Sequence, residues 1–536
     1  MKSRHPRIRL ASLATLALAA GLLAGCAEES KGDDGKAADS GSSIFEIGLV
    51  GDSAAGDPVA GGRLDVSSYS ELRTFDPVGV IAGGLSGGTE LAAIYDVLLR
   101  YDPEQGEYQP QLAEGISADD AFTTWTLTLR PDVTFSDGTP VDADAVVGSI
   151  ERYLAEGGGQ ATLFQRKVKA TKAIDERTVE FTMTEPWADF EYMLATAPGM
   201  IVAPAAYAGK EFTPIGAGPF TFVHYRPTEE LLLKANPAYW GGAPNLAELR
   251  FRNVQTAQGT LDVVRTGDAD VAVLREPNVI ADAVDADLAG SMNVVSMGVG
   301  LIVNSREGID TAEVLVRRAI SQALDPQVII DRSYAGIGLP GTQMFADESR
   351  WRGKVEGPQI DVDAAKELVE QAKAKGFDGT IRYLGIAKVS QNTGVAIEAM
   401  LGRIGITVEA EYVPGAAEMI QRVFVDRDFD LAGWSFGTPD AGVFPELFES
   451  FHSESNGNAG GYSSEVMDGL IADLGSATSV EDQQQILDRI QEEWNATVPA
   501  IVFGAQPEFV TWGEQVGGVR PHVDSMVLFD QAWVAE

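Results

Sequence analysis

The sequence predicts a mixed α/β fold, and three observations support this. Strand patterns and helix patterns alternate along most of the chain. No segment of the chain repeats, which argues against a solenoid or a propeller. The chain has 536 residues, too many for one compact core, and this length predicts about three domain-sized units. Together these features indicate an α/β or α+β architecture with more than one core.

Strands are predicted where apolar and polar residues alternate. Trp125, Leu127 and Leu129 alternate with threonines, which is the period of a half-buried strand. The same pattern recurs at 179–183 and at 406–412. The run FSDGT at 135–139 contains an Asp-Gly turn signal.

Helices are predicted where apolar residues recur at helical spacing behind a capping residue. One face is formed by Leu91, Ile94, Tyr95 and Leu98, after Thr89. A further helix is expected over 363–375, before Gly376, because glycine is frequent just past a helix end. The other candidate N-caps are Asp142, Thr311 and Ser479, and the helix that begins near Thr311 is expected to end near Asp325 and Pro326.

The composition is that of a globular protein with a large acidic excess. Hydrophobic residues make up 45% and charged residues 22% of the chain. The 79 Asp and Glu outnumber the 40 Lys and Arg, for a net charge of −39. This charge repels nucleic acid and anionic lipid, so we expect no nucleic acid partner. The acidic excess favours solubility, and a specific cationic ligand is the alternative.

The N-terminal residues resemble an export signal. Residues 1–9 are basic and residues 10–24 are small and apolar. These roughly 15 apolar residues fall short of the ~20 that a membrane-spanning helix needs. The stretch ends in LAGC at 23–26, which resembles a bacterial lipobox and contains the only cysteine of the chain. We therefore expect residues 1–25 to be removed and Cys26 to carry a lipid, with a plain signal peptide as the alternative.

Residues 26–57 are predicted to form a flexible tether. The segment is rich in Gly, Ser, Asp and Ala, with one short apolar interruption at 44–50. A chain of this length and composition spans roughly 30 Å root-mean-square. The tether would hold a globular body off the membrane surface.

Several segments, in order along the chain, resemble the family 5 extracytoplasmic solute-binding proteins of ABC importers, which include peptide, dipeptide and nickel-binding members. The most specific is LRPDVTFSDGTPVDADAVVGSIER at 129–152, and the next is VRRAISQALDPQVII at 316–330. The remaining matches are 61–64, 75–77, 94–99, 109–114, 214–220, 236–242, 404–406 and 429–434.

The resemblance implies a two-lobed fold like that of periplasmic binding proteins (type II, cluster C), with an extra subdomain in lobe one. The expected boundaries are 58–96, 97–212 as the extra subdomain, and 213–297 for lobe one, 298–503 for lobe two, and 504–536 for a return to lobe one.

The resemblance also implies the function. We expect the extracellular binding component of an ABC importer, which captures an oligopeptide or a similar-sized organic molecule by lobe closure and delivers it to a permease. Such a protein is not an enzyme, needs no cofactor and acts as a monomer. It would lie on the outer face of a bacterial membrane, held by its lipid. A non-peptide ligand, such as an oligosaccharide or a metal chelate, remains an alternative.

In peptide-binding members of the family, an acid in the segment after Gly-Trp holds the ligand's α-ammonium group. That position appears here as Gly437, so either Asp440 replaces the acid or the ligand lacks a free amine. Stacking on aromatic side chains and an anion contact at Lys388 are further options. The candidate ligand-binding residues are Trp434, Phe436, Thr438, Asp440, Tyr69, Tyr334, Lys388, Asn392 and Tyr462.

Three other classes of function compete with this reading. A hydrolase would use Ser86 in the G-x-S-x-G run at 84–88, but such a site needs a preceding strand and a histidine. Metal capture has little support, because the chain has four histidines and no HExxH or CxxC spacing. A purely structural envelope protein would bind no solute.

Overall fold

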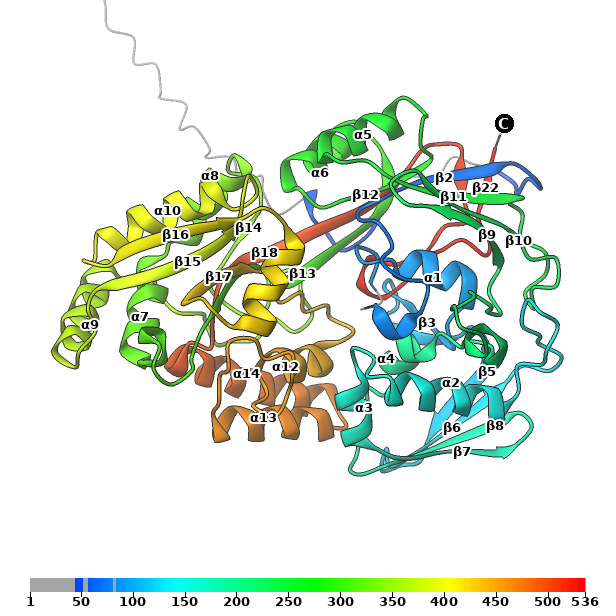
Figure 1. Ribbon diagram of the computed structural model, residues 1–536, viewed down its shortest axis with the longest axis horizontal. Helices are drawn as coiled ribbons and strands as arrows, with labels where there is room; N and C mark the ends of the chain where they lie inside the picture. Colours follow the sequence, from blue (N-terminus) through cyan, green and yellow to red (C-terminus); the bar gives the residue numbers. More distant parts are fainter. Residues whose placement is uncertain (1–43, 52–55, 81–82, 536) are drawn as a thin grey trace, which may run out of the picture. The chain divides into compact units, whose positions relative to one another are not determined.

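A computed structural model describes residues 44–51, 56–80 and 83–535, and all of these belong to one unit, residues 40–536 (Figure 1). The signal and lipobox predictions, and most of the tether, lie outside the described residues. Within the described residues, no helix has the length and hydrophobicity needed to cross a bilayer.

The largest sheet is built around two long antiparallel strands, β13 (Ala289–Val303) and β18 (Ala500–Trp512), which run side by side through the molecule (Figure 1). On one side of this pair lie β17 (Leu431–Trp434), β15 (Thr380–Ile386) and β16 (Thr407–Val413). On the other side lie β12 (Val271–Leu274), β2 (Arg63–Ser68), β11 (Glu248–Asn253), β10 (Glu230–Ala235) and β9 (Phe220–Arg226). The pair β13 and β18 therefore connects two halves of the sheet.

The pairing of β13 and β18 is irregular where the two halves meet. The register shifts between Val295 and Val299, and Gly504 of β18 has a φ of +148°. A side chain at Gly504 would stand 2.0 Å from the Leu339 carbonyl oxygen, so the residue must be small. This irregularity lies near the lobe boundaries expected at 297–298 and 503–504. The boundaries of the lobes and of the extra subdomain stay predictions.

A separate four-stranded antiparallel sheet, in the order β5 (Ala113–Ala118), β6 (Thr124–Leu129), β8 (Thr178–Met183) and β7 (Val168–Asp175), lies in the first part of the chain. The smaller strands are β1 (Gly48–Val50), β3 (Leu99–Asp102), β4 (Glu107–Pro110), β14 (Leu339–Pro340), β19 (Val516–Gly517), β20 (Arg520–Pro521), β21 (Val527–Leu528) and β22 (Trp533–Val534).

Helices flank both sheets. The first group is α1 (Gly88–Tyr95), α2 (Ala143–Ala155), α3 (Ala161–Lys167), α4 (Glu191–Leu194), α5 (Ala257–Arg265), α6 (Pro277–Val284) and α7 (Val314–Ala323). The second group is α8 (Pro326–Tyr334), α9 (Val362–Ala374), α10 (Gln391–Gly402), α11 (Ala416–Ile420), α12 (Val443–Phe451), α13 (Glu465–Ser476) and α14 (Val480–Thr497).

The predicted strands and two of the expected helix caps are confirmed. The first helix differs from the expectation, because Gly87 rather than Thr89 is the N-cap of α1, and α1 ends at Tyr95, before Leu98. In β6 and β8 the apolar residues are buried in strict alternation, as the sequence pattern indicates. Asp142 caps α2 by accepting from the amide of Ala145, and Ser479 caps α14 by accepting from the amide of Asp482. Gly138 in the Asp-Gly turn has a φ of +85°, a conformation that glycine adopts at little cost.

The structure corrects the cap expected at Thr311. Glu313 caps α7, because its carboxylate accepts from the amide of Leu315. The Thr311 hydroxyl is buried and donates instead to the carbonyl oxygen of Asn304. Asp325 begins the next helix, α8, as its N-cap. The Thr311 hydroxyl, which the local sequence predicts to cap a helix, thus forms a tertiary hydrogen bond instead.

The tether expected over 26–57 does not hold along its whole length. Strand β1 pairs with β13, and Phe45 is fully buried beside Leu274 and Met292 in the core of the sheet. The physical reason is the apolar interruption at 44–50, which gains more from burial than from hydration.

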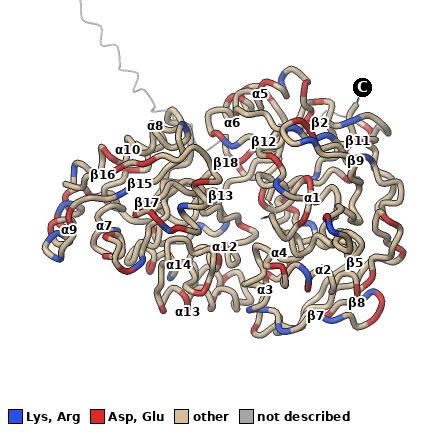
Figure 2. Tube along the Cα trace, in the orientation of Figure 1, with Lys and Arg blue, Asp and Glu red and all other residues tan. Residues whose placement is uncertain are grey.

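Acidic and basic residues are interspersed over the elements in Figure 2. This distribution fits the solubility reading of the acidic excess. A cavity lined mainly by charges of one sign would therefore differ from the rest of the molecule.

Candidate ligand-binding site

A cavity of about 500 Å³ lies where the two halves of the sheet meet. One side is formed by residues 434–437 and 439, which end and follow β17, by α12, and by the segment 457–462. The other side is formed by the loop 83–86, Arg275, Glu508 and Asp524. The volume is within the usual range of small-molecule sites, roughly 300–1,000 Å³.

Aromatic rings line one end of the cavity. Trp434, the last residue of β17, packs against Phe424 with ring centroids 5.0 Å apart. Phe436 packs against Phe451 of α12, also at 5.0 Å. These rings form an apolar wall on which an alkyl or aromatic group can stack.

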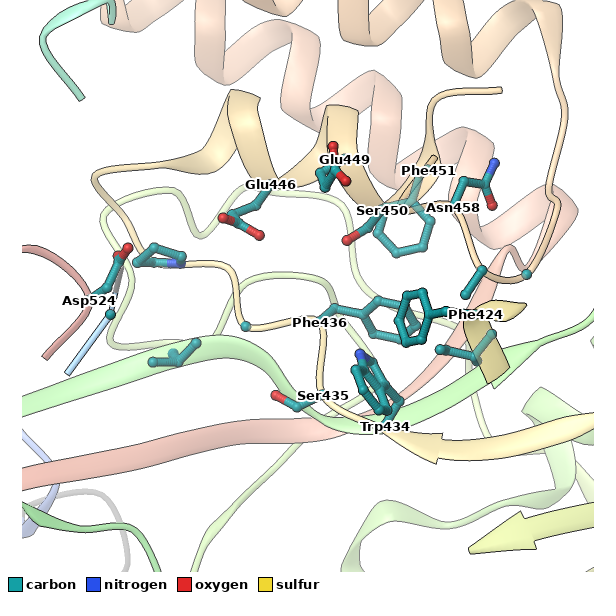
Figure 3. A pocket seen from close by; sticks show the side chains of 18 of the residues that line it. Phe424, Trp434, Ser435, Phe436, Glu446, Glu449, Ser450, Phe451, Asn458 and Asp524 are labelled. Carbon is teal, nitrogen blue, oxygen red and sulfur yellow. The ribbon is translucent and has the colours of Figure 1, made fainter. Parts of the chain in front are cut away.

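Carboxylates line the edge of the cavity that lies across from Trp434. Figure 3 shows Glu446, Glu449 and Ser450 along one edge of the cavity, across from Trp434. Their spacing along α12 places them on one face of the helix, while Leu447 is buried on another. Burial raises the pKa of Glu446 well above its usual range, and the charges of Asp524 and Glu449 add to this shift. Burial also raises the pKa of Glu449, against hydrogen bonds from Ser455 and the Gly457 amide.

Arg275, which follows β12, is the only Lys or Arg among the described residues that line this cavity. Its Nη2 donates to the Ser435 hydroxyl at 3.2 Å, and its Nε lies 3.6 Å from a carboxylate oxygen of Glu508. Within the described part of the chain, that buried Nε has no hydrogen-bond partner. The guanidinium is thus neutralised by Glu508 but keeps an unsatisfied donor.

Asp524 lies at the end of the cavity (Figure 3). Its Oδ2 accepts from the Tyr192 hydroxyl at 2.9 Å. Its Oδ1 is buried and, among the residues described, has no hydrogen-bond partner. Burial raises the pKa of Asp524 to about 7, although the bond from Tyr192 opposes the shift.

Of the predicted site residues, Trp434, Phe436 and Tyr462 line the cavity. Tyr462 is nearly buried, and its hydroxyl lies 2.8 Å from that of Thr497. The three lie within 28 residues of one another in the sequence, and the fold brings them to one cavity.

Thr438 and Asp440 do not line this cavity. Thr438 is buried, and its amide donates to the Ser296 carbonyl oxygen. The Asp440 carboxylate accepts from the Ser349 hydroxyl and the Arg350 amide. It lines a second cavity of about 410 Å³, which shares Pro439 and Asp524 with the first.

Tyr69 and Tyr334 lie close to Arg275 without lining the cavity themselves. Lys388 and Asn392 are exposed near the start of α10 and line neither cavity. Lys388 has a φ of +69°, in the turn between β15 and α10.

Sequence reasoning missed Arg275, Glu446, Glu449 and Asp524. The two glutamates lie on the polar face of an amphipathic helix, a face that usually meets solvent. Arg275 and Asp524 lie in connecting segments without a recognisable motif. No signal in the sequence shows that these groups face the same cavity.

Gly437 lines the cavity with a φ of +43°. A Cβ built on it would meet nothing closer than 3.8 Å. The position therefore leaves open space where the resemblance places an acid. Among the described residues, no group of three or more His, Cys, Asp or Glu side chains is arranged to hold a metal ion.

The fold and the cavity define a class of protein: two-lobed binding proteins with a site between the lobes. Solved structures of this class match the chain over most of its length. The oligopeptide-binding protein AppA from Bacillus subtilis, in complex with a nonapeptide, has a TM-score of 0.76 at 20% identity and covers 90% of this chain and 100% of its own. AgaA from A. tumefaciens R10, in complex with agropinic acid, has a TM-score of 0.74 at 22% identity and covers 89% and 99%. At these identities the likeness shows the fold alone.

The chain belongs to the bacterial extracellular solute-binding proteins, family 5, because the model of the family's middle region matches residues 107–457, more than half of the sequence. The probable D,D-dipeptide-binding periplasmic protein DdpA of Escherichia coli K12 is 28% identical over 450 residues, which are 79% of this chain and 84% of that protein. The glutathione-binding protein GsiB of Salmonella typhi is 24% identical over 459 residues, 82% and 88% of the two chains. The two-lobed fold and the solute-binding function predicted from the sequence are confirmed.

Proposed function

We propose that this chain captures a peptide, or an organic solute of similar size, in the cavity between the two halves of its sheet and delivers it to an ABC permease. The cavity supports the proposal most directly, because residues of both halves line it and two of their buried polar atoms, Arg275 Nε and Asp524 Oδ1, lack partners within the described chain. The relatives named for dipeptides and for glutathione support a peptide-sized ligand.

Capture works through a shift between open and closed forms. A ligand that touches both Trp434 after β17 and Arg275 after β12 makes all its contacts only when the two sides are close together. It therefore stabilises the closed form by the difference in contacts. The closed form is then the one that a permease recognises, and the protein acts as a monomer.

Binding without catalysis fits the surroundings of Ser86. The residues described before the 84–88 run, Pro77–Gly79, form a 3-10 turn rather than the strand that a nucleophile elbow needs. None of the described histidines lines the cavity. His522, for example, is buried, where its ring accepts from the Tyr101 amide.

We infer a lipid anchor at Cys26 from the lipobox-like run 23–26. In a bacterial host, labelled palmitate should be incorporated into the wild-type chain and not into Cys26→Ser. The variant should leave the membrane fraction, since one lost anchor removes the whole attachment. Labelled Cys26→Ser would contradict the assignment.

The central test is binding and closure. The lipid-free chain that begins at residue 27, directly after Cys26, is mixed with a pool of synthetic dipeptides and tripeptides and studied by native mass spectrometry and small-angle X-ray scattering. We expect a one-to-one complex and a smaller radius of gyration with the pool. Unchanged scattering and no complex with any peptide would overturn the proposed function.

A further inference from the structure

The charge of the cavity lining is strongly one-sided. Four carboxylates face it, those of Glu446, Glu449, Glu508 and Asp524, against the single guanidinium of Arg275. Arg275 is already placed beside Glu508. The three remaining acids have no basic side chain opposite them in the described lining. In a partly enclosed space such an arrangement raises the free energy of the empty protein.

The acids are also short of hydrogen bonds. Within the described residues, no donor contacts the Glu446 carboxylate, and the Oδ1 atom of Asp524 is buried without a partner. Native proteins pair nearly all buried polar atoms, so an unpaired one at a cavity points to a missing partner. A group that donates hydrogen bonds and carries positive charge would satisfy both acids.

The aromatic wall fits the same kind of ligand. Trp434 and Phe436 lie across the cavity from Glu446 and can pack against the apolar part of a ligand. Their ring faces also attract a cation at short range. Gly437 adds open space beside them and no charge.

We propose that the cavity selects a ligand with an organic cation, an ammonium or guanidinium group, held between Glu446 of α12 and Asp524 of the C-terminal segment, with its apolar part on Trp434 and Phe436. The inference rests on the proposed function and names the chemical class of its ligand. The acid that holds the cation comes from α12 and the C-terminal segment, and not from the stretch that directly follows Trp434.

The raised pKa values of Glu446, Glu449 and Asp524 support this assignment. With a pKa of about 7, Asp524 is partly protonated at neutral pH while the cavity lacks a cation, and a bound cation favours its ionised form. Ligand binding at neutral pH therefore releases protons to the buffer.

The experiment compares matched ligand pools by native mass spectrometry. One pool holds tripeptides of neutral side chains with free N-termini, the second holds the same peptides N-acetylated, and the third holds N-acetylated peptides that contain Lys or Arg. We expect the first pool to be retained and the second to be lost by at least tenfold. Retention of the third pool would assign the cation to a ligand side chain, within the same chemical class.

Variants test which acids are responsible. Glu446→Gln and Asp524→Asn keep the size of each side chain and remove its charge, and each should weaken binding of the first pool by at least tenfold. Glu492→Gln on α14, whose side chain is exposed, serves as the control and should bind as the wild type does. Thermal unfolding of each variant confirms that it is folded.

The outcomes separate the two proposals. Equal retention of the free and the N-acetylated neutral peptides would overturn the cation assignment and leave the proposed function standing. Wild-type affinity in both Glu446→Gln and Asp524→Asn would also overturn it. If no peptide from any pool is retained, the proposed function fails, and the assignment that rests on it fails too.

Discussion

Two faces of helix α12 meet the rest of the molecule in opposite ways. One face carries Phe444, which packs against the buried Trp187 with ring centroids 5.9 Å apart. The other carries Glu446 and Glu449, which face the cavity. The same nine residues thus build a dry contact and a polar, incompletely satisfied wall.

Lys167 shows how the dry contact handles a charge. Its ammonium group donates to Glu185 at 2.9 Å, to the Pro186 carbonyl at 3.1 Å and to the Gly475 carbonyl of α13 at 2.9 Å. A lysine has three donors, and here each has a partner. The buried charge of Lys167 thus has hydrogen-bond partners where α3 packs against α13. Glu446 and the Oδ1 atom of Asp524 have no such partner among the described residues, in the cavity where we propose that a ligand binds.

The largest expected effect comes from removing the hydrogen bonds of Lys167. Lys167→Met keeps an unbranched side chain, shorter by the terminal atom, and leaves the Gly475 and Pro186 carbonyls without their donor. It should lower the free energy of unfolding by about 2 kcal/mol. It should also favour a more open ligand-free form, because Lys167 joins α3 to α13. Denaturant unfolding and X-ray scattering measure the two effects.

Lys169→Met is the matched control, since Lys169 lies two residues away and is exposed. It should change the free energy of unfolding by less than about 0.5 kcal/mol. Equal losses in both variants would show that the three hydrogen bonds of Lys167 do not hold the contact.

An intermediate effect is expected at the aromatic wall. Trp434→Ala should weaken binding of a retained peptide at least tenfold, about 1.4 kcal/mol, because the ligand loses a stacking surface. The protein should stay folded, since Trp434 is only partly buried. Calorimetry measures the affinity, and Trp533→Ala, on β22 and outside the cavity, is the control. Unchanged affinity in Trp434→Ala would remove that residue from the site.

The smallest effect concerns stability at the acidic wall. Burial raises the pKa of Glu446 in the folded state, so the folded protein loses stability as pH rises above the unfolded value near 4.5. Glu446→Gln removes this penalty and should stabilise the ligand-free protein at pH 8 by up to about 1 kcal/mol. At pH 3.5 the carboxyl is mostly protonated in both states, and the gain should vanish.

Thermal unfolding at the two pH values measures this difference. Lower stability of Glu446→Gln at pH 8 would mean that a partner within the protein already satisfies the carboxylate. Weaker binding together with higher stability in one variant would be the signature of a group kept for its ligand.

Local patterns predicted much of the fold. The alternation in β6 and β8, the caps of α2 and α14, and the Asp-Gly turn depend on neighbouring residues and were readable from the sequence. The predictions were wrong where a residue distant in sequence offers a more favourable contact. Thr311 donates to Asn304 instead of capping a helix, and Phe45 enters a core formed by residues more than 200 positions away.

The residues of the candidate site also divide into those that the sequence predicted and those that only the fold revealed. Trp434 and Phe436 follow from motif resemblance and Tyr462 from its aromatic residue type, and all three line the cavity. Lys388 and Asn392 were plausible only by residue type, and the fold leaves both exposed. Arg275, Glu446 and Asp524 could not be found, because their common feature is a shared space and not a spacing in sequence.

The sequence by itself determined the α/β class and the family, because short-range periodicity and ordered motifs are written along the chain. Only the tertiary structure decided which charges face one another. Burial and the lack of a partner are properties of a residue's surroundings, and for Glu446 and Asp524 those surroundings come from segments about 80 residues apart, joined only when the chain is folded.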